Sequence, residues 1–452
     1  MLRQKEQAMP LESPLDSAIN SYDKWHSEAP KDKFFLCYLV FVLLGVGALF
    51  PWNAFLTAID YFSDLYDDFP FAFALALAYN YPSVISLLLS IRFGPKFSFT
   101  SRILFGLLVN CLVMIVVPLI KVSGVPTTAS LCLTLFAAFV TGCAQAVLFG
   151  GVLGLASLFP PTYVGAVMSG NGVAGIGVGL LRIITKAAFP HGKLFVHLFL
   201  CLYILTYNQP TALFTSAVIY FSISGAIMLM CAISYIFFLR LPYTKYHMQS
   251  NGYKPLDEAS NLMENTDDTM KGTGHEEKVS YWTIFKKIWK EALLVMLVFF
   301  ITLSLFPGIT LKIQTTSSGL GQDWFAILMV FNFQFFDFVG RTIPRFFVGL
   351  SKRTLWLPVA LRAVFYVLFI LCIKPYVLRS DGWSMTLMAL FALSNGYLGT
   401  LGMMFGPTSA APHEKQVAGI VMSFFLNFGI FLATHFALVL LYAVDGSIPF
   451  KS

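Results

Sequence analysis

Two ionisable residues stand four positions apart inside a long apolar stretch, FNFQFFDFVGR (331–341). Asp337 and Arg341 would therefore share one face of a helix and could form an ion pair. Charged side chains in hydrocarbon are costly and usually face a cavity or a partner. A carboxylate here can accept hydrogen bonds from hydroxyl groups, while a guanidinium fork holds it and donates further bonds. The alternative is a buried pair that only fixes helix packing. Gln334 and Asn332 lie on nearby faces of the same helix.

A second stretch, LFPWNAFLTAIDYF (49–62), places a proline, a tryptophan and an asparagine inside another apolar run. Pro51 would bend a helix and free one backbone carbonyl. A flat aromatic ring beside an amide, as in Trp52 and Asn53, suits a flat heteroaromatic solute by stacking and hydrogen bonding. Asp60 is either a charge at the end of this helix or a group that binds a proton.

Other polar residues in apolar runs have simpler interpretations. Arg182 and Lys186 are four apart and close to a helix end, from which both could reach the membrane surface. The preceding MSGNGVAGIGVG (168–179) carries small residues at helical spacing. This spacing predicts close helix packing, with Asn171 as the one candidate contact residue. His435 stands alone in the last apolar run and is interpreted as a satisfied core histidine.

The composition makes the chain a membrane protein. Of its residues 57% are hydrophobic and 12% are charged, against about 25% charged in soluble domains. Apolar runs of about 20 residues, long enough to cross a hydrocarbon core of about 30 Å, recur along the sequence. We therefore predict an all-α polytopic fold with eleven transmembrane helices. The predicted spans are 34–57, 71–92, 102–122, 128–157, 163–188, 212–240, 291–313, 324–347, 354–374, 383–405 and 417–443.

Lys and Arg residues set the predicted orientation. They gather in the N-terminal tail and in the second, sixth and eighth loops, whereas the first loop carries only acids, so the tail and the even-numbered loops are predicted to be cytosolic. One long polar stretch without hydrophobic periodicity predicts a flexible cytosolic loop that separates six spans from five. The predicted units are a cytosolic tail (1–33), a six-helix bundle (34–241), the flexible loop (242–290), a five-helix bundle (291–445) and a non-cytosolic tail (446–452).

Several function classes are disfavoured by what the sequence lacks. The net charge of +7 lies in short clusters between apolar runs, as membrane topology requires, so no nucleic-acid partner is predicted. The seven cysteines show no metal-binding spacing, and neither a metal nor another cofactor is expected. No HExxH, GxSxG or Walker motif is present, so we do not expect an enzyme or an ATP-driven pump.

The chain resembles the equilibrative nucleoside transporter family, in particular its plant-like members. GVGALFPWNAFLTAIDYF is similar to the opening element of that family, and FDFVGR matches an element of its eighth span. LSNGYLGTLGMMFGP and AGIVMSFFL resemble its last two spans, while FITLSLFPGI and LRIITKAAFP resemble its seventh and its plant-type fifth. The match runs in order over nearly all of 34–443. It implies a major-facilitator-like fold that works by alternating access, with nucleosides and sometimes nucleobases as substrates.

The resemblance also implies roles for particular residues. By matched position, Trp52, Asn53 and Leu56 would line the end of the substrate cavity that holds the purine or pyrimidine. Asp337 and Arg341 would meet the ribose hydroxyls.

The sequence departs from the family at a few positions. Gln334, also expected to contact substrate, stands where the family often has an asparagine. Many members carry a base-contacting glutamine in the fourth span, where this chain has Gly150, with Gln145 five residues earlier. Base selectivity is therefore open, and Gln145, Gly150 and Asn171 are its candidate positions. Residues 193–209 resemble an insertion; we hypothesise a retained intron or a mis-predicted exon, and a spliced transcript that encodes all of them would overturn that hypothesis.

We therefore expect a nucleoside transporter whose further partners are the lipid bilayer and, if transport is coupled, protons. Facilitated diffusion and proton symport both stay open, with Asp60 and Asp337 as the candidate proton-binding groups. The alternatives are a transporter of organic cations or another small solute in the same fold and, from a different class, a membrane enzyme acting on a lipid-borne substrate. The plasma membrane is the expected location, with the tonoplast or another endomembrane as the alternative. The sequence leaves open the purine or pyrimidine preference and the oligomeric state.

Overall fold

The computed structural model describes most of the chain between residues 30 and 445. The described ranges are 30–66, 69, 71–188, 212–250, 280–317, 319, 321–373 and 377–445. Four predicted segments lie outside them: the segment that resembles an insertion (193–209), the central part of the predicted flexible loop (251–279), and the two tails up to residue 29 and from residue 446.

Eleven helices within the described ranges are long and apolar enough to cross a membrane, which confirms the predicted number. A helix satisfies its own backbone hydrogen bonds, as a hydrocarbon environment requires. The first six are α2 (Leu36–Thr57), α4 (Phe71–Phe93), α5 (Phe99–Val122), α6 (Thr127–Ala156), α7 (Pro161–Ala188) and α9 (Ala212–Phe238). The last five are α12 (Tyr281–Leu305), α13 (Gln322–Thr342), the broken span α14 (Trp356–Leu361) and α15 (Val364–Ile373), α16 (Asp381–Phe405) and α17 (Lys415–Asp445).

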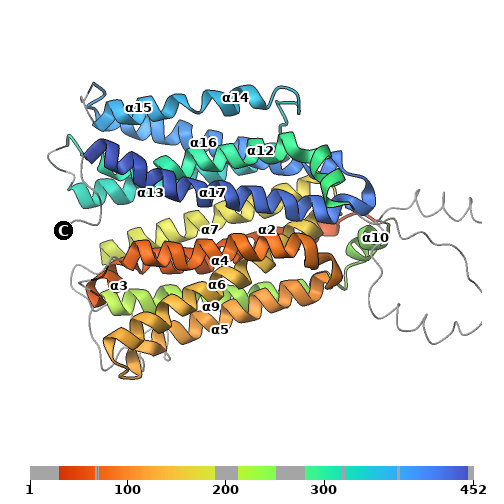
Figure 1. Ribbon diagram of the computed structural model, residues 1–452, viewed down its shortest axis with the longest axis horizontal. Helices are drawn as coiled ribbons and strands as arrows, with labels where there is room; N and C mark the ends of the chain where they lie inside the picture. Colours follow the sequence, from red (N-terminus) through yellow and green to blue (C-terminus); the bar gives the residue numbers. More distant parts are fainter. Residues whose placement is uncertain are drawn as a thin grey trace, which may run out of the picture.

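The helices form two bundles that lie side by side. In Figure 1 the six N-terminal spans fill the lower half of the molecule and the five C-terminal spans fill the upper half. Two short helices complete the described fold, α3 (Ile59–Leu65) directly after α2 and α10 (Pro242–Ser250) after α9. The predicted six-plus-five architecture is therefore confirmed.

The structure corrects the predicted boundaries of the flexible loop. Residues 242–250 form α10, and α12 begins at Tyr281 rather than at 291, while 251–279 lie outside the described residues. The early start of α12 has a local cause, because the hydroxyl of Ser280 accepts a hydrogen bond from the backbone nitrogen of Thr283 at 3.4 Å. A serine in this position caps the N-terminus of a helix.

The ninth span is also interrupted where one continuous helix was predicted. Between α14 and α15 the backbone N–H of Arg362 is shared between the carbonyls of Pro358 and Val359, at 3.3 and 3.2 Å. The backbone nitrogen of Phe365 then bonds back to the carbonyl of Arg362, three residues earlier. Such bonds mark a tightened, 3₁₀-like turn, which places Arg362 at a break in the middle of the span.

The two ends of the bundles differ in charge. We call the end at which α2 begins the basic end, because Lys33, Arg92, Lys96, Arg345 and Lys352 gather there. The opposite end, which carries α3, is called the far end. Lys and Arg accumulate on the cytosolic side of membrane proteins, so the basic end is the predicted cytosolic side.

Packing between the bundles is also asymmetric along this axis. In the basic half, one apolar cluster joins both bundles and includes Leu153 and Val164 of the first with Met404 and Val421 of the second. In the far half, the buried residues form separate clusters, one around Phe62 in the N-terminal bundle and one around aromatic rings of the C-terminal bundle. Among the described residues, the common core that joins the bundles therefore lies near the basic end.

Candidate substrate site between the bundles

The predicted ion pair forms in α13. The Nε of Arg341 lies 2.6 Å from the Oδ2 of Asp337, and the two side chains are only 8% and 5% exposed. Helical spacing of four residues brings them to one face. Each charge is out of water, so the pair must find further polar partners to be stable.

Asparagine from the neighbouring helix supplies one of these partners. Asn395 of α16 donates from Nδ2 to the Oδ1 of Asp337 at 2.7 Å, so both carboxylate oxygens accept a bond. Within the described part of the chain, the two terminal nitrogens of Arg341 have no hydrogen-bond partner. The guanidinium therefore holds Asp337 with its Nε and keeps its terminal donors for another group.

Glycines bring α13 and α16 into backbone contact at this point. A Cβ added to Gly396 would meet the backbone nitrogen of Arg341 at 2.7 Å, and one added to Gly340 would meet the backbone nitrogen of Tyr397 at 2.9 Å. Small residues allow this approach, which larger side chains would prevent. The close contact sets Asn395 opposite Asp337.

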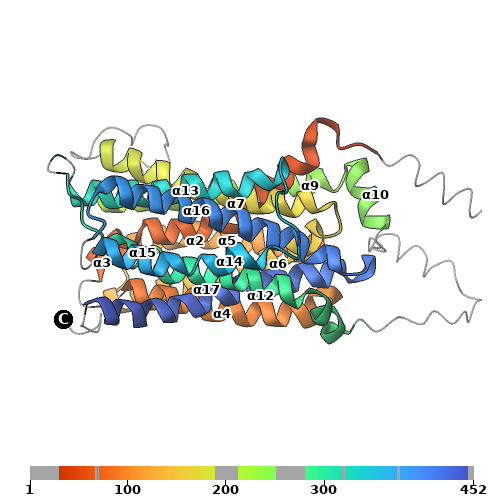
Figure 2. The same cartoon turned by 90° about the horizontal axis from the view of Figure 1, so that it is seen from above.

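The other side of α13 lies on α7 of the first bundle, and the two helices run alongside each other in both views (Figures 1 and 2). A Cβ added to Gly172 would meet the Cα of Phe338 at 2.9 Å, and one added to Gly175 would meet the Cδ of Gln334 at the same distance. Ser169 donates to the backbone carbonyl of Arg341 at 3.1 Å. The predicted packing role of residues 168–179 is confirmed, and the site residues of α13 lie at the seam between the bundles.

The residues expected at the base end occupy one stretch of α2. Trp52 stacks on Tyr79 of α4, with ring centroids 4.1 Å apart and an interplanar angle of 24°. Asn53 is 7% exposed and its Nδ2 has no hydrogen-bond partner among the described residues. Leu56 is 42% exposed. The buried, unbonded amide of Asn53 is a donor that a ligand could use, and the roles of these three residues stay predictions.

The candidate selectivity residues are spread over different contacts. Gln145 of α6 accepts a bond from the Nδ2 of Asn110 in α5 at 3.1 Å, inside the first bundle. A Cβ at Gly150 would lie 3.2 Å from Leu87. The side chain of Leu87 therefore lies close to the position at which many family members carry a glutamine. Asn171 is buried and its Oδ1 has no partner in the described structure.

Two further predicted residues lie near the far end. Asp60 belongs to α3, and its side chain lies outside the described part. Lys186 forms an ion pair of 3.1 Å with Asp323 of α13, which links the bundles at this end. Arg182 donates to the backbone carbonyl of Thr57 at 3.2 Å.

His435 of α17 is bonded at both ring nitrogens, as expected for a satisfied histidine. Its Nε2 lies 2.9 Å from the hydroxyl of Tyr81 in α4, and its Nδ1 lies 2.9 Å from the carbonyl of Phe431. Because Tyr81 belongs to the first bundle, this contact also crosses the seam.

Three polar residues of the second bundle were missed in the sequence. Arg362 is 2% exposed, and Thr302 and Asn395 are buried beside it. An ionisable residue inside a predicted span was the signal for Asp337, and Arg362 carried the same signal. Thr302 and Asn395 are uncharged and gave none.

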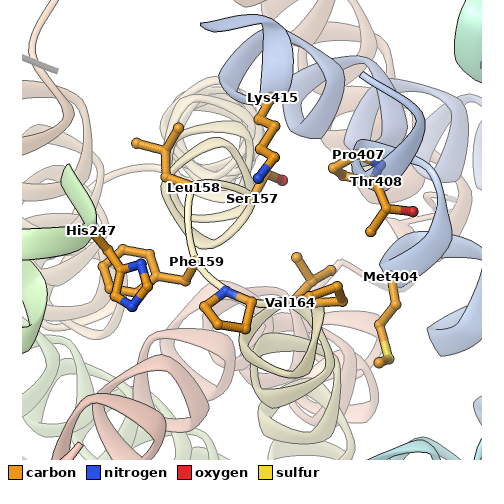
Figure 3. A pocket seen from close by; sticks show the side chains of 11 residues that line it. Ser157, Leu158, Phe159, Val164, His247, Met404, Pro407, Thr408 and Lys415 are labelled. Carbon is orange, nitrogen blue, oxygen red and sulfur yellow. The ribbon is translucent and has the colours of Figure 1, made fainter. Parts of the chain in front are cut away.

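A pocket of about 280 Å³ lies between the bundles at the basic end. Figure 3 shows Lys415 beside Ser157 on one side of it and His247 against Phe159 on another. Burial and then the charge of Lys415 lower the pKa of His247. Nearby, a Cβ added to Gly419 of α17 would meet the carbonyl oxygen of Leu153 in α6 at 2.6 Å. The backbones of the two bundles are therefore in contact at the basic end.

Comparison with known proteins identifies the family. A family model described as nucleoside transporter matches residues 135–442. The chain belongs to the equilibrative nucleoside transporter family. It is 31% identical to the Arabidopsis thaliana protein named equilibrative nucleotide transporter 1, over 91% of this chain and 87% of that protein. It is 27% identical to equilibrative nucleoside transporter 1 of Rattus norvegicus, over 92% and 98%.

The fold also matches solved structures. The proton:xylose symporter XylE, a major facilitator superfamily protein, superimposes with a TM-score of 0.62 at 10% identity, covering 91% of this chain and 89% of that one. This likeness establishes the predicted major-facilitator-like fold of this family member. Members of the family are transporters, so the expectation that the chain is not an enzyme is confirmed.

Proposed function

We propose that this chain carries nucleosides across a membrane by alternating access, with the plasma membrane as its location. One observation carries the proposal: the Asp337–Arg341 pair is held at the seam between the bundles, with the terminal nitrogens of Arg341 free to donate. A ribose has vicinal hydroxyls that can accept from a guanidinium and donate to a carboxylate. The nucleoside transporter family supplies the substrate class.

The aromatic stack of α2 and α4 would hold the other end of the substrate. Purines and pyrimidines are flat, and Trp52 offers the face of an indole ring beside the unbonded amide of Asn53. Stacking and one hydrogen bond would position the base. Gln334 of α13 lies against Gly175 of α7, one turn before Asp337, where it would follow any movement of the two helices.

The asymmetric packing supports a state that is closed on the predicted cytosolic side. The common core and the Gly419–Leu153 contact join the basic halves, while the far halves keep separate cores. In alternating access, one bundle rocks against the other around a site near the membrane midplane. We propose that the basic halves separate and the far halves close when substrate is released.

The experiment is uptake of labelled adenosine and uridine by cells that lack nucleoside transport and express this chain. Surface biotinylation confirms that the protein is present. Uptake at external pH 5.5 and 7.5, with and without a protonophore, separates the two energetic modes. Acid-stimulated, protonophore-sensitive uptake means proton symport, and uptake indifferent to both means facilitated diffusion. Absence of uptake of both nucleosides by surface-exposed protein would overturn the proposal.

Asp337→Asn is the matched variant, because it keeps the shape of the side chain and removes its charge. We expect it to reach the surface in part and to lose nucleoside uptake, since an amide cannot serve Arg341 and Asn395 as a carboxylate does. Asp323→Asn removes a carboxylate that is 82% exposed and serves as the control.

A further inference from the structure

Arg362 lies where the ninth span breaks, with its guanidinium inside the C-terminal bundle. It is 2% exposed, and its Nη1 donates to the carbonyl of Phe391 at 2.9 Å and to the hydroxyl of Ser394. The guanidinium also lies over the ring of Phe391, 4.7 Å from its centroid. A buried cation needs polar partners, because it has lost its contacts with water.

Two uncharged residues connect Arg362 by hydrogen bonds with the carboxylate of Asp337. The Nη2 of Arg362 donates to the hydroxyl of Thr302 at 2.6 Å, and this hydroxyl lies 2.7 Å from the Oδ1 of Asn395. The Nδ2 of Asn395 donates to the Oδ1 of Asp337 at 2.7 Å. A continuous line of hydrogen bonds therefore connects Arg362 with Asp337 across α12, α16 and α13.

The donors in this line all point the same way. Arginine has only donors, so Thr302 must accept from Arg362. The single proton of Thr302 has two acceptors at 2.7 Å, the Oδ1 of Asn395 and the backbone carbonyl of Val298. The Oδ1 of Asn395 faces Thr302, and its NH₂ group faces Asp337. At the far end, Asp337 meets N–H donors at both oxygens, from Asn395 and from Arg341. Asp337 is therefore the acceptor at the end of the line.

We propose that Arg362 is a positioning residue that holds Asp337 in place as a hydrogen-bond acceptor, through Thr302 and Asn395. This inference rests on the proposed function and deepens it. Asp337, held in this way, would contribute ribose recognition.

The surroundings of Asp337 agree with this role. The charged and titratable groups that face the line are Arg341 on α13, Arg362 itself and Tyr366 on α15, whose hydroxyl lies 2.5 Å from that of Ser304 on α12. From α7, the group that faces the pair is the hydroxyl of Ser169, which bonds to the backbone of Arg341. No carboxylate among the described residues shares the site, so two cations stand against one anion.

A purely structural Arg362 would tie α15 to α16 and do nothing more. The two roles differ in what their loss changes. If Arg362 only supports the fold, its removal lowers the number of working transporters, and the uptake of every substrate falls in parallel. If it positions Asp337, its removal weakens the binding of substrates that use the ribose hydroxyl and spares analogues that lack it.

The test compares uridine with 3′-deoxyuridine as inhibitors of labelled uridine uptake in the same null cells. For the wild type we expect uridine to bind about tenfold more tightly, the cost of one hydrogen bond to a charged group. Arg362→Gln should raise the inhibition constant of uridine about tenfold and leave that of 3′-deoxyuridine within about twofold of the wild-type value. The ratio of the two inhibition constants then falls towards one. The conservative Arg362→Lys keeps the charge and should restore part of the ratio.

Thr302→Val provides the second test, because it keeps the shape of the side chain and the other contacts of Arg362 while removing the link. It should lower the ratio of the two inhibition constants as Arg362→Gln does. If Arg362→Gln does not reach the cell surface, Thr302→Val alone tests the positioning role. Ser394→Ala removes a bond of the same guanidinium that leads away from Asp337, and it should keep the wild-type ratio.

The outcomes separate the inference from the proposed function. If the wild type takes up no nucleoside, the proposed function fails. If the wild type discriminates between the two inhibitors and Thr302→Val keeps that discrimination, the positioning role of Arg362 is wrong while the function stands. A wild type that transports uridine without discriminating against 3′-deoxyuridine would also overturn the inference, because Asp337 would then not meet that hydroxyl.

Discussion

Gly396 of α16 lies directly against the backbone of Arg341 in α13. A Cβ added to this glycine would stand 2.7 Å from the Arg341 nitrogen and closer still to the carbonyl oxygen of Asp337. Backbone atoms on a buried helix cannot move aside as a flexible side chain can. The glycine therefore fixes how closely the two helices approach, and with it the distance over which Asn395 reaches Asp337.

Replacing this glycine should separate the helices. We expect Gly396→Ala to destabilise the protein by about 1–3 kcal/mol, the usual cost of overpacking, and to reduce uptake strongly. Gly382→Ala in the same helix is the control, because a Cβ there meets only the Ser380 hydroxyl, at an ordinary 3.5 Å. Thermal unfolding of the detergent-solubilised proteins measures the difference, and equal midpoints for both variants would contradict the expected contact.

The two ion pairs of α13 should differ greatly in their contribution to the free energy of unfolding. Breaking the buried Asp337–Arg341 pair with Asp337→Ala should cost about 3–5 kcal/mol, because it leaves a buried charge without its partner. Asp323→Ala should cost about 0–1 kcal/mol, since its pair with Lys186 is exposed to solvent. Unfolding midpoints in detergent at low and at high salt give both values, and a midpoint for Asp337→Ala near that of the wild type would argue against a buried pair.

Gly150 offers a test of the departure from the family. We expect Gly150→Gln to lower the maximal uptake rate without giving a new base preference, because Leu87 and Ile420 already lie 3.2 and 3.6 Å from the added Cβ and leave no space for an amide. Gly150→Ala requires only a small shift of the flexible end of Leu87, so nucleoside uptake by this variant should stay within about twofold of the wild type. A changed ratio of adenosine to uridine uptake in Gly150→Gln would instead place this residue at the substrate.

His247 should make stability depend on pH. Burial and the charge of Lys415 lower its pKa in the folded protein, so the unfolded chain binds a proton more readily than the folded one. Stability is then full above the ordinary histidine pKa of about 6.5 and is lost as the pH falls below it. The unfolding midpoint of the wild type should drop more between pH 7.5 and 5.5 than that of His247→Gln.

Lys415→Gln is the companion variant for this prediction. It removes the second cause of the lowered pKa and keeps the burial of His247, so its pH dependence should lie between those of the wild type and His247→Gln. Identical pH profiles for the three proteins would show that His247 does not titrate differently in the folded state.

The parts of this site that could be predicted from the sequence are those set by spacing within one helix. Asp337 and Arg341 pair because they are four apart, and the small residues of 168–179 form one helix face for the same reason. Long apolar runs likewise predict the eleven spans, because hydrocarbon leaves the backbone few alternatives to a helix.

The contacts that no spacing rule reaches are those between helices. Asn395 finds Asp337, and Thr302 finds Arg362, only through the relative register of three helices, which depends on glycine contacts such as that of Gly396. The break at Arg362 was missed because neither glycine nor proline stands at 361–364 to signal it.

The seam between α7 and α13 has a further consequence for the speed of the transport cycle. On the α7 side it includes Gly172, Gly175 and Gly179, which meet Phe338, Gln334 and Phe331 across the contact. Glycine has no side chain to rearrange. In the proposed rocking of the bundles, the bulky side chains of α13 would therefore have to rearrange against these positions, so the helix that holds the ion pair would also influence the rate of transport.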